Sequence, residues 1–343
     1  MPFVRIKKRA TSPAMTPQMK QAFELYVATL QDSAFGKAPD YLLNNPGALP
    51  WKYAEELFLD AWEEAARAEI EEAGKKAAGE IPAEALRFPT SKDDLRRVFT
   101  LDNPYTAPWI ERRGADLVKE VTSQTKMAVR SLVSSGFAEH RTVQEMGRLI
   151  RGYKDASGVH HPGVIGLLER DVAAVDRYYS ALLADGWTEE KALKAASRYS
   201  KNLLNRRGTN IARTETNFAQ NHGTLASWQT VQDDGLLLDE ARKRWIAAPS
   251  ERTCPICVRL HNKMAPVNGS FEGGLDSPPA HPSCRCSMSL FTIVPGMSRK
   301  IPEPYTEQQI ERFVEQGRKH RQKRAANRAK WLRSGAKSRF LDD

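Results

Sequence analysis

The stretches T-C-P-I-C, residues 253–257, and P-P-A-H-P-S-C-R-C, residues 278–286, contain all four cysteines of the 343-residue chain. Two cysteines at C-x2-C spacing can offer two thiolates to one cation, and a returning H-x2-C-x-C can complete a tetrahedral shell of nitrogen and sulfur. The pattern therefore predicts a structural Zn²⁺ site. Its candidate ligands are Cys254, Cys257, His281, Cys284 and Cys286.

Five candidates compete for the four ligand positions of a tetrahedral ion. One of them must therefore lie next to the bound ligands without contacting the ion, or have no role in metal binding. Cys284 and Cys286 are two residues apart and can share one ion only on a bent, non-helical turn. The alternative is two disulfides, or one disulfide and two buried thiols. A reducing cytoplasm favours the metal, and the sequence predicts that compartment because no apolar segment follows the charged N-terminus as a secretory signal requires.

The segment between the two cysteine groups is too rich in Gly and Pro to form a helix, and it has too few apolar residues for a core of its own. A bound metal would order it, because metal binding is then coupled to folding. Residues 242–247 and 287–294 on either side have the composition or alternation of strands. We therefore expect a small α+β module at 241–295.

The rest of the chain is predicted to be mainly helical, because apolar residues recur at helical spacing. Gly136 is expected to end the third helix, a capping box at Thr142 to open the fourth, and Asn205–Gly208 to stop the sixth. The loop 152–163, with His160 and His161, is interpreted as solvated rather than metal-binding. The expected helices are 16–30, 51–79, 109–133, 142–150, 164–183, 188–204, 211–232 and one starting at Thr306.

This pattern divides the chain into four predicted parts. They are a helical arm at 1–105, a helical body at 106–240, the Cys/His module at 241–295 and a basic helix at 296–343. No apolar run approaches the roughly 18 residues that a membrane-spanning helix needs, so no membrane partner is expected.

The positive charge is concentrated at the C-terminus. Ten cations without an intervening acid match the whole formal net charge of +10, so a polyanion partner is expected to bind there. Non-specific contact with double-stranded DNA would suit this run. The alternatives are an acidic protein surface and a merely solvated helix. The ten are Arg318, Lys319, Arg321, Lys323, Arg324, Arg328, Lys330, Arg333, Lys337 and Arg339.

A resemblance rests on I-A-R-T-E-T at 211–216, Trp228, C-P-I-C, P-P-A-H-P-S-C-R-C and the S-L-F that follows. Over about residues 106–295 the chain resembles the phage head morphogenesis family typified by protein F of phage Mu, and H-P-x-C-R-C is the most specific element. Relatives usually read L-D-G after the first cysteine pair, where this chain has Leu260-His261-Asn262. No ligand role is therefore carried over to His261.

The resemblance implies a minor head protein of a tailed phage or prophage, with an assembly role at the portal vertex and the procapsid interior. The implied partners are the portal protein, capsid or scaffold proteins and packaged DNA. The implied location is the virion, after assembly in the host cytoplasm. Arg213 and Glu215 cannot face each other on one helix. They are either two solvated polar residues or, as the resemblance implies, structural residues that pin this helix to its neighbours.

Catalytic signatures are mostly missing, so the chain is expected not to be an enzyme. No H-x-E precedes the cysteines as a zinc deaminase requires, and neither a P-loop nor a dinucleotide fingerprint occurs. The alternative function is a metal-dependent HNH-like nuclease with His261 as base. Its metal-binding histidine would have to be His281, which the predicted zinc site already uses.

Overall fold

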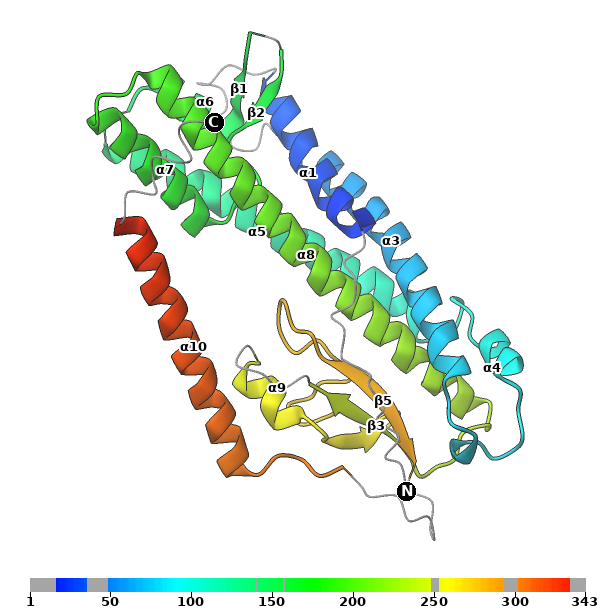
Figure 1. The fold of residues 1–343 in the computed structure, drawn as a ribbon. Coiled ribbons are helices and arrows are strands. Elements are labelled where there is room, and N and C mark those ends of the chain that lie inside the picture. The colour runs from blue at the N-terminus through cyan, green and yellow to red at the C-terminus, as the bar shows by residue number, and fades with distance from the viewer. Residues whose placement is uncertain are drawn as a thin grey trace. The chain divides into compact units, whose positions relative to one another are not determined.

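A computed structural model describes residues 17–35, 49–139, 141–156, 158–247, 253–292 and 302–333 (Figure 1). The side chains of residues 137, 143 and 328–333 are outside this description. The described chain is mostly helical with small antiparallel sheets, which confirms the predicted fold class. Among these residues, no helix is both long and apolar enough to cross a bilayer.

Along the sequence, helices occur both before and after the strands of a small C-terminal sheet. They are α1 (Pro17–Phe35), α3 (Trp51–Gly79), the 3-10 helix η2 (Ala83–Ala85), α4 (Lys92–Val98), α5 (Thr106–Ala138), α6 (Val143–Arg151), α7 (Glu169–Ala184), α8 (Glu189–Asp233), α9 (Pro255–Leu260) and α10 (Glu307–Arg333).

The described residues group into two compact units. One comprises Ala66–Pro108 and the described residues from Arg213 onward, and the other comprises Trp109–Ala212 and the described residues of 15–65. The limit at Pro108 lies close to the expected boundary after residue 105. The division into 1–105, 106–240, 241–295 and 296–343 is not tested by this grouping and stays a prediction.

The unit that contains α5 to α7 has an aromatic core. Phe23, Tyr26, Phe58 and Trp62 are at most 1% exposed, and the rings of Tyr26 and Phe58 lie 5.6 Å apart. The ring of Trp62 lies 6.3 Å from that of Trp109. These residues come from α1, α3 and α5, whose helical apolar stripes were predicted from periodicity.

The prediction of a loop at 152–163 is partly wrong, because β1 (Gly152–Lys154) and β2 (His160–Pro162) form an antiparallel hairpin. Gly152 has a φ of 81°, and a Cβ there would lie 1.9 Å from the carbonyl oxygen of His161. His161 stacks on Tyr153 at 4.6 Å, and its Nε2 lies 2.9 Å from Asp155. The histidines thus take part in the hairpin and its turn. The capping box at Thr142 is confirmed.

Gly136 does not end α5, which continues to Ala138. A Cβ at Gly136 would lie 2.2 Å from the sulfur of Met146. The glycine therefore allows close packing of α6 on α5, and the prediction that it breaks the helix was wrong.

The stop expected at Asn205–Gly208 was also wrong, because α8 is one continuous helix of 45 residues. Arg207 is buried and donates to the Gly166 carbonyl at 2.6 Å and to Gln124 Oε1 at 2.8 Å. Burial lowers the pKa of Arg207 to about 10. These contacts and the packing of Gly208 on Phe23 offset the cost of about 1 kcal/mol for a glycine inside a helix.

The other unit has its main apolar core around the C-terminal part of α8. Leu225, Trp228 and Val231 of that helix pack with residues of α3, α4 and the segment before the sheet. Gly223 lies against the backbone of α3, where an added Cβ would be 2.4 Å from the Ile70 carbonyl oxygen. Only a residue without a side chain permits this approach.

A three-stranded antiparallel sheet has the order β4-β3-β5, with β3 (Ala241–Ile246) between β4 (Met264–Pro266) and β5 (Ser287–Thr292). The strands expected at 242–247 and 287–294 are thus confirmed within the described residues, while α9 and β4 were not predicted. Burial alternates along β3, so Ala241, Lys243 and Trp245 face inward.

The predicted C-terminal helix is confirmed as α10, and Thr306 caps it by accepting from Gln309 N at 3.3 Å. Ile310 is 4% exposed. Tyr305 lies between the rings of His261 and Phe313, at 4.9 Å and 5.2 Å. The first turns of α10 therefore pack on the α9 region.

Candidate metal centre

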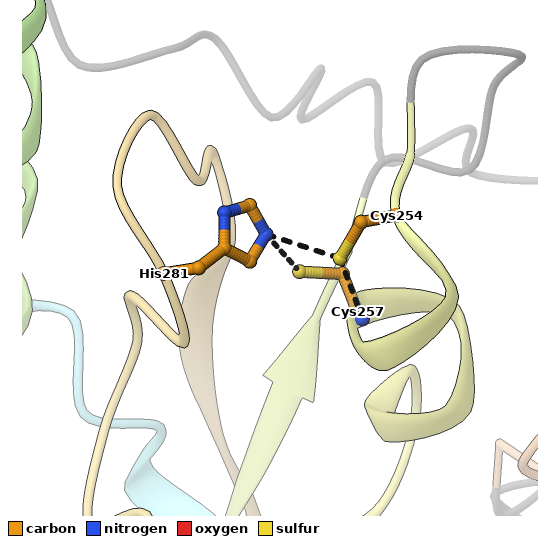
Figure 2. Close-up of side chains that lie close together, drawn as sticks. All are labelled: Cys254, Cys257 and His281. Atoms are coloured by element: carbon orange, nitrogen blue, oxygen red, sulfur yellow. Dashed lines mark hydrogen bonds between the residues drawn. The ribbon is translucent and has the colours of Figure 1, made fainter.

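The first two candidate ligands are placed by the short helix α9. Cys254 is its N-cap, and its sulfur accepts from the backbone N–H of Cys257 at 3.3 Å. Pro255 at the first helical position suits this cap because its missing N–H would have no helical partner. The C-x2-C spacing thus becomes one helical turn that brings both sulfurs to one side (Figure 2).

His281 points its ring at these two sulfurs from the loop before β5 (Figure 2). Its Nε2 lies 3.0 Å from the Cys254 sulfur and 3.3 Å from the Cys257 sulfur. Its Nδ1 lies 2.8 Å from the Pro282 carbonyl oxygen. Because a carbonyl only accepts, Nδ1 carries a proton, and in the neutral ring the lone pair is on Nε2, where a metal would bind.

A turn brings the last two cysteines back towards α9. Ser283 has a φ of 61°, in the left-handed region, and the N–H of Cys284 donates to the His281 carbonyl at 3.1 Å. The sulfur of Cys284 lies 3.5 Å from that of Cys257. The bent turn that a shared ion would need is therefore present.

Three polar side chains of α8 hold this turn, and no spacing in the sequence predicted their contacts with it. Thr214 Oγ1 accepts from the Ser283 N–H at 2.9 Å, Asn217 Nδ2 donates to the Cys284 carbonyl at 3.1 Å, and Asn221 Nδ2 donates to the Cys286 carbonyl at 3.3 Å. We call Thr214, Asn217 and Asn221 the α8 clamp.

The spacing of the clamp has a simple geometric basis. Four residues of helix advance about 6 Å, and two residues of extended chain advance about 6.6 Å. Asn217 and Asn221 can therefore reach the carbonyls of Cys284 and Cys286 in parallel. The signal in the sequence is an N-x3-N pair on the helix that carries I-A-R-T-E-T, and it becomes interpretable only when the partner segment is known.

The cluster is held mostly away from solvent, which shapes its protonation. Cys257, Cys284 and Cys286 are 3–5% exposed, while Cys254 and His281 are half-buried. Hydrogen bonding within the cluster, first with Cys257, lowers the pKa of Cys254 and of Cys284. The pKa of Cys257 itself is raised, mainly by its contact with Cys254. The cluster therefore favours the thiolate form for part of its cysteines, and thiolate is the form that binds a metal.

The chemistry of the donor set fits a metal ion. Cys254, Cys257 and His281 form one group whose donor atoms lie within 4.8 Å of one another, and Cys257, Cys284 and Cys286 form another. All four cysteines are free, so the disulfide alternative is not the arrangement seen here. The Cys/His cluster can therefore hold a metal ion.

The two residues predicted to pin α8 lie in different surroundings. Glu215 is 1% exposed, whereas Arg213 is exposed, and the structure shows no ion pair of its guanidinium within the described ranges. The paired structural role of Arg213 and Glu215 stays a prediction.

His261, the base of the alternative nuclease, lies at the C-cap of α9. Its Nδ1 accepts from the Ala247 N–H at 3.1 Å, and its ring stacks on Tyr305. Burial, with a smaller effect from Arg244, lowers its pKa. His261 is in neither group of potential metal ligands formed by the described residues.

The basic run lies only partly in the described chain. Arg318, Lys319, Arg321, Lys323 and Arg324 are exposed on α10. Glu315 pairs with Arg318 at 2.8 Å and with Lys319 at 3.7 Å. The side chains of Arg328, Lys330 and Arg333 are not described, and Lys337 and Arg339 lie outside the described residues.

Comparison with known proteins adds one finding. Residues 175–289 match the family model described as Phage Mu protein F like protein. The matched region begins within α7 and ends within β5, so it includes the α8 clamp and all five Cys/His donors. The match confirms the resemblance that the sequence motifs predicted. No curated protein and no solved structure matches the chain.

Proposed function

We propose, from the premise that residues 175–289 are a Phage Mu protein F like region, that the chain is a minor head protein of a tailed phage or prophage. It would act in head assembly at the portal vertex and the procapsid interior, in contact with the portal protein and with capsid or scaffold proteins. The observation that carries this proposal is that the matched region contains the whole Cys/His cluster together with the helix that holds it.

The cluster is proposed to bind Zn²⁺ in a structural role, through ligands drawn from Cys254, Cys257, His281, Cys284 and Cys286. Cysteine and histidine donors suit Zn²⁺, and a site closed by four protein ligands leaves no position for substrate. The loop at 268–279 supports this role because it contains no regular helix or long strand that would order it.

The basic run from Arg318 to Arg339 is proposed to contact packaged DNA through its phosphates. The five described cations of this run are exposed on α10, beyond the turns that pack on the α9 region. Arginine and lysine side chains around a helix bind phosphates without reading bases, so this contact would be independent of sequence.

A pull-down with the portal protein of the same phage or prophage tests the proposed role. Tagged portal protein should retain the full-length chain, and purified procapsids should contain it. Absence of the chain from both the portal fraction and the procapsids would contradict the proposal.

The alternative nuclease is tested on supercoiled plasmid with added divalent metal. The half-buried position of His261, with its Nδ1 accepting from the Ala247 N–H, supports a structural role for this side chain. Wild type and His261→Ala should both leave the plasmid intact. Cleavage by wild type that is lost in His261→Ala would favour the nuclease.

A further inference from the structure

The five candidate ligands are arranged as two overlapping groups with Cys257 in common. The contacts between donor atoms join Cys254 to His281 at 3.0 Å, His281 to Cys257 at 3.3 Å and Cys257 to Cys284 at 3.5 Å. Four residues are thus connected in one chain of contacts. Cys286 belongs only to the group with Cys257 and Cys284.

These distances can be compared with those of a metal shell. With Zn–S bonds of about 2.3 Å and Zn–N bonds of about 2.0–2.1 Å, neighbouring donors of a tetrahedron lie about 3.4–3.8 Å apart. The three observed contacts lie at or slightly below this range. The sulfur of Cys284 is not within the mutual group of Cys254, Cys257 and His281, so it must move towards Cys254 or His281 before one ion can bind all four donors.

Cys286 is positioned differently from Cys284. It leads directly into β5, where Ser287 pairs with Ile246 of β3, and Asn221 holds its carbonyl. Its side chain is 4% exposed and lies in the apolar cluster of Trp245 and Phe271, which also contains Cys257 and Cys284. A buried free cysteine in such surroundings behaves as a small apolar residue.

We propose that one metal ion is held by Cys254, Cys257, His281 and Cys284, and that Cys286 is a buried thiol of the module's apolar core. This assignment rests on the proposed structural zinc site and deepens it. The site would then have three sulfur ligands and one nitrogen ligand, and the α8 clamp would position a ligand through Asn217.

The assignment predicts opposite behaviour of two neighbouring cysteines in the full-length, reduced protein. Zn²⁺ affinity is measured by competition with a chromophoric chelator for wild type, Cys284→Ala, Cys286→Ala and Cys286→Ser. Cys284→Ala should weaken Zn²⁺ binding by more than about 100-fold, beyond the usual effect of an outer-shell change. At least one Cys286 variant should bind one equivalent within about 10-fold of wild type, the lower end of that outer-shell effect.

X-ray absorption at the zinc edge of the wild type provides a measurement that needs no variant. Three sulfurs and one nitrogen are expected. Four sulfurs would overturn the assignment, and so would tight binding by Cys284→Ala or weak binding by both Cys286 variants. Wild type that binds no zinc would contradict the zinc site itself and this assignment with it. A zinc-binding wild type with another ligand set contradicts only the assignment.

Discussion

At the residue scale, the potential ligands were predictable and the residues that hold them were not. C-x2-C and H-x2-C-x-C have few other uses in one short stretch, so their spacing alone indicated Cys254 and its four partners. Asn217 and Asn221 are 67 and 65 residues from the cysteines whose carbonyls they bind. No local pattern connects an asparagine on a helix with a distant carbonyl.

Replacement of Asn217 tests the α8 clamp. Asn217→Ala removes the donor to the Cys284 carbonyl and leaves a buried acceptor unpaired, which should lower the free energy of unfolding by about 1–3 kcal/mol. Thr224→Ala is the matched control, because Thr224 bonds only to the Gln220 carbonyl of its own helix. Urea unfolding of both variants measures the difference. Equal effects of the two substitutions would argue against the clamp.

Lys243 gives the module a predicted pH dependence. Its Nζ donates to the Asp276 carbonyl at 2.8 Å on the inner face of β3, and burial lowers its pKa to about 8 from the ordinary 10.5. Between these two pH values the unfolded chain binds more protons at this lysine than the folded chain. Its contribution to stability should therefore rise from pH 8 to pH 10.5.

The comparison of wild type with Lys243→Met isolates this contribution. The free energy of unfolding of wild type relative to the variant should increase over that pH interval, by at most about 1.4 kcal/mol per unit of pKa difference. Below pH 8 the difference should be constant. A difference that stays constant up to pH 10.5 would show that the Lys243 ammonium is not appreciably desolvated.

At the element scale, the helices with clear apolar stripes were predicted well, and two of the errors, the helix ends expected at Gly136 and Gly208, concern glycine. The expected bounds of α3 agree with the structure, whereas Gly136 and Gly208 were interpreted as helix ends. A glycine that ends a helix and one that permits close packing look the same in a sequence. The difference depends on the facing surface, here Met146 and Phe23.

Gly223 on α8 allows a quantitative test of close packing. Alanine should favour the helix by about 1 kcal/mol by propensity. Its Cβ, however, would lie 2.4 Å from the Ile70 carbonyl oxygen, and backbone cannot move aside as a side chain can. We expect Gly223→Ala to be destabilised by about 1–3 kcal/mol, as overpacked sites are.

Gly208→Ala is the control for Gly223→Ala, because its new Cβ would meet side-chain carbons of Phe23 at 3.0 Å. This variant should lose less stability in a thermal or urea unfolding measurement. Greater destabilisation of Gly208→Ala than of Gly223→Ala would contradict the close approach of α8 to α3.

At the scale of the whole molecule, the basic run and the apolar packing contacts of the α10 region lie in different parts of the sequence. The apolar contacts of α10 lie at Tyr305, Ile310 and Phe313, before the basic run begins. A cut after Pro304 would remove these contacts, whereas a cut after Gly317 keeps them. The second truncation removes ten cations and two acids and lowers the formal net charge from +10 to +2.

The truncation after Gly317 should stay folded and lose DNA binding. For the full-length protein, the affinity for double-stranded DNA should fall with salt, with a log–log slope of about 0.9 per phosphate contacted. A full-length variant with glutamine at five exposed cations elsewhere, Lys92, Arg97, Lys191, Lys194 and Lys201, is the control and should keep most of its affinity. Equal binding by the truncated and full-length proteins at low salt would refute a DNA contact by this run.

The metal content of the reduced, full-length protein tests the central claim most directly. Elemental analysis should find about one equivalent of zinc, as a closed four-ligand site implies. Cys257→Ser should lose it, because Cys257 is the residue common to both donor groups. Protein that is free of metal and contains two intact disulfides would contradict the account.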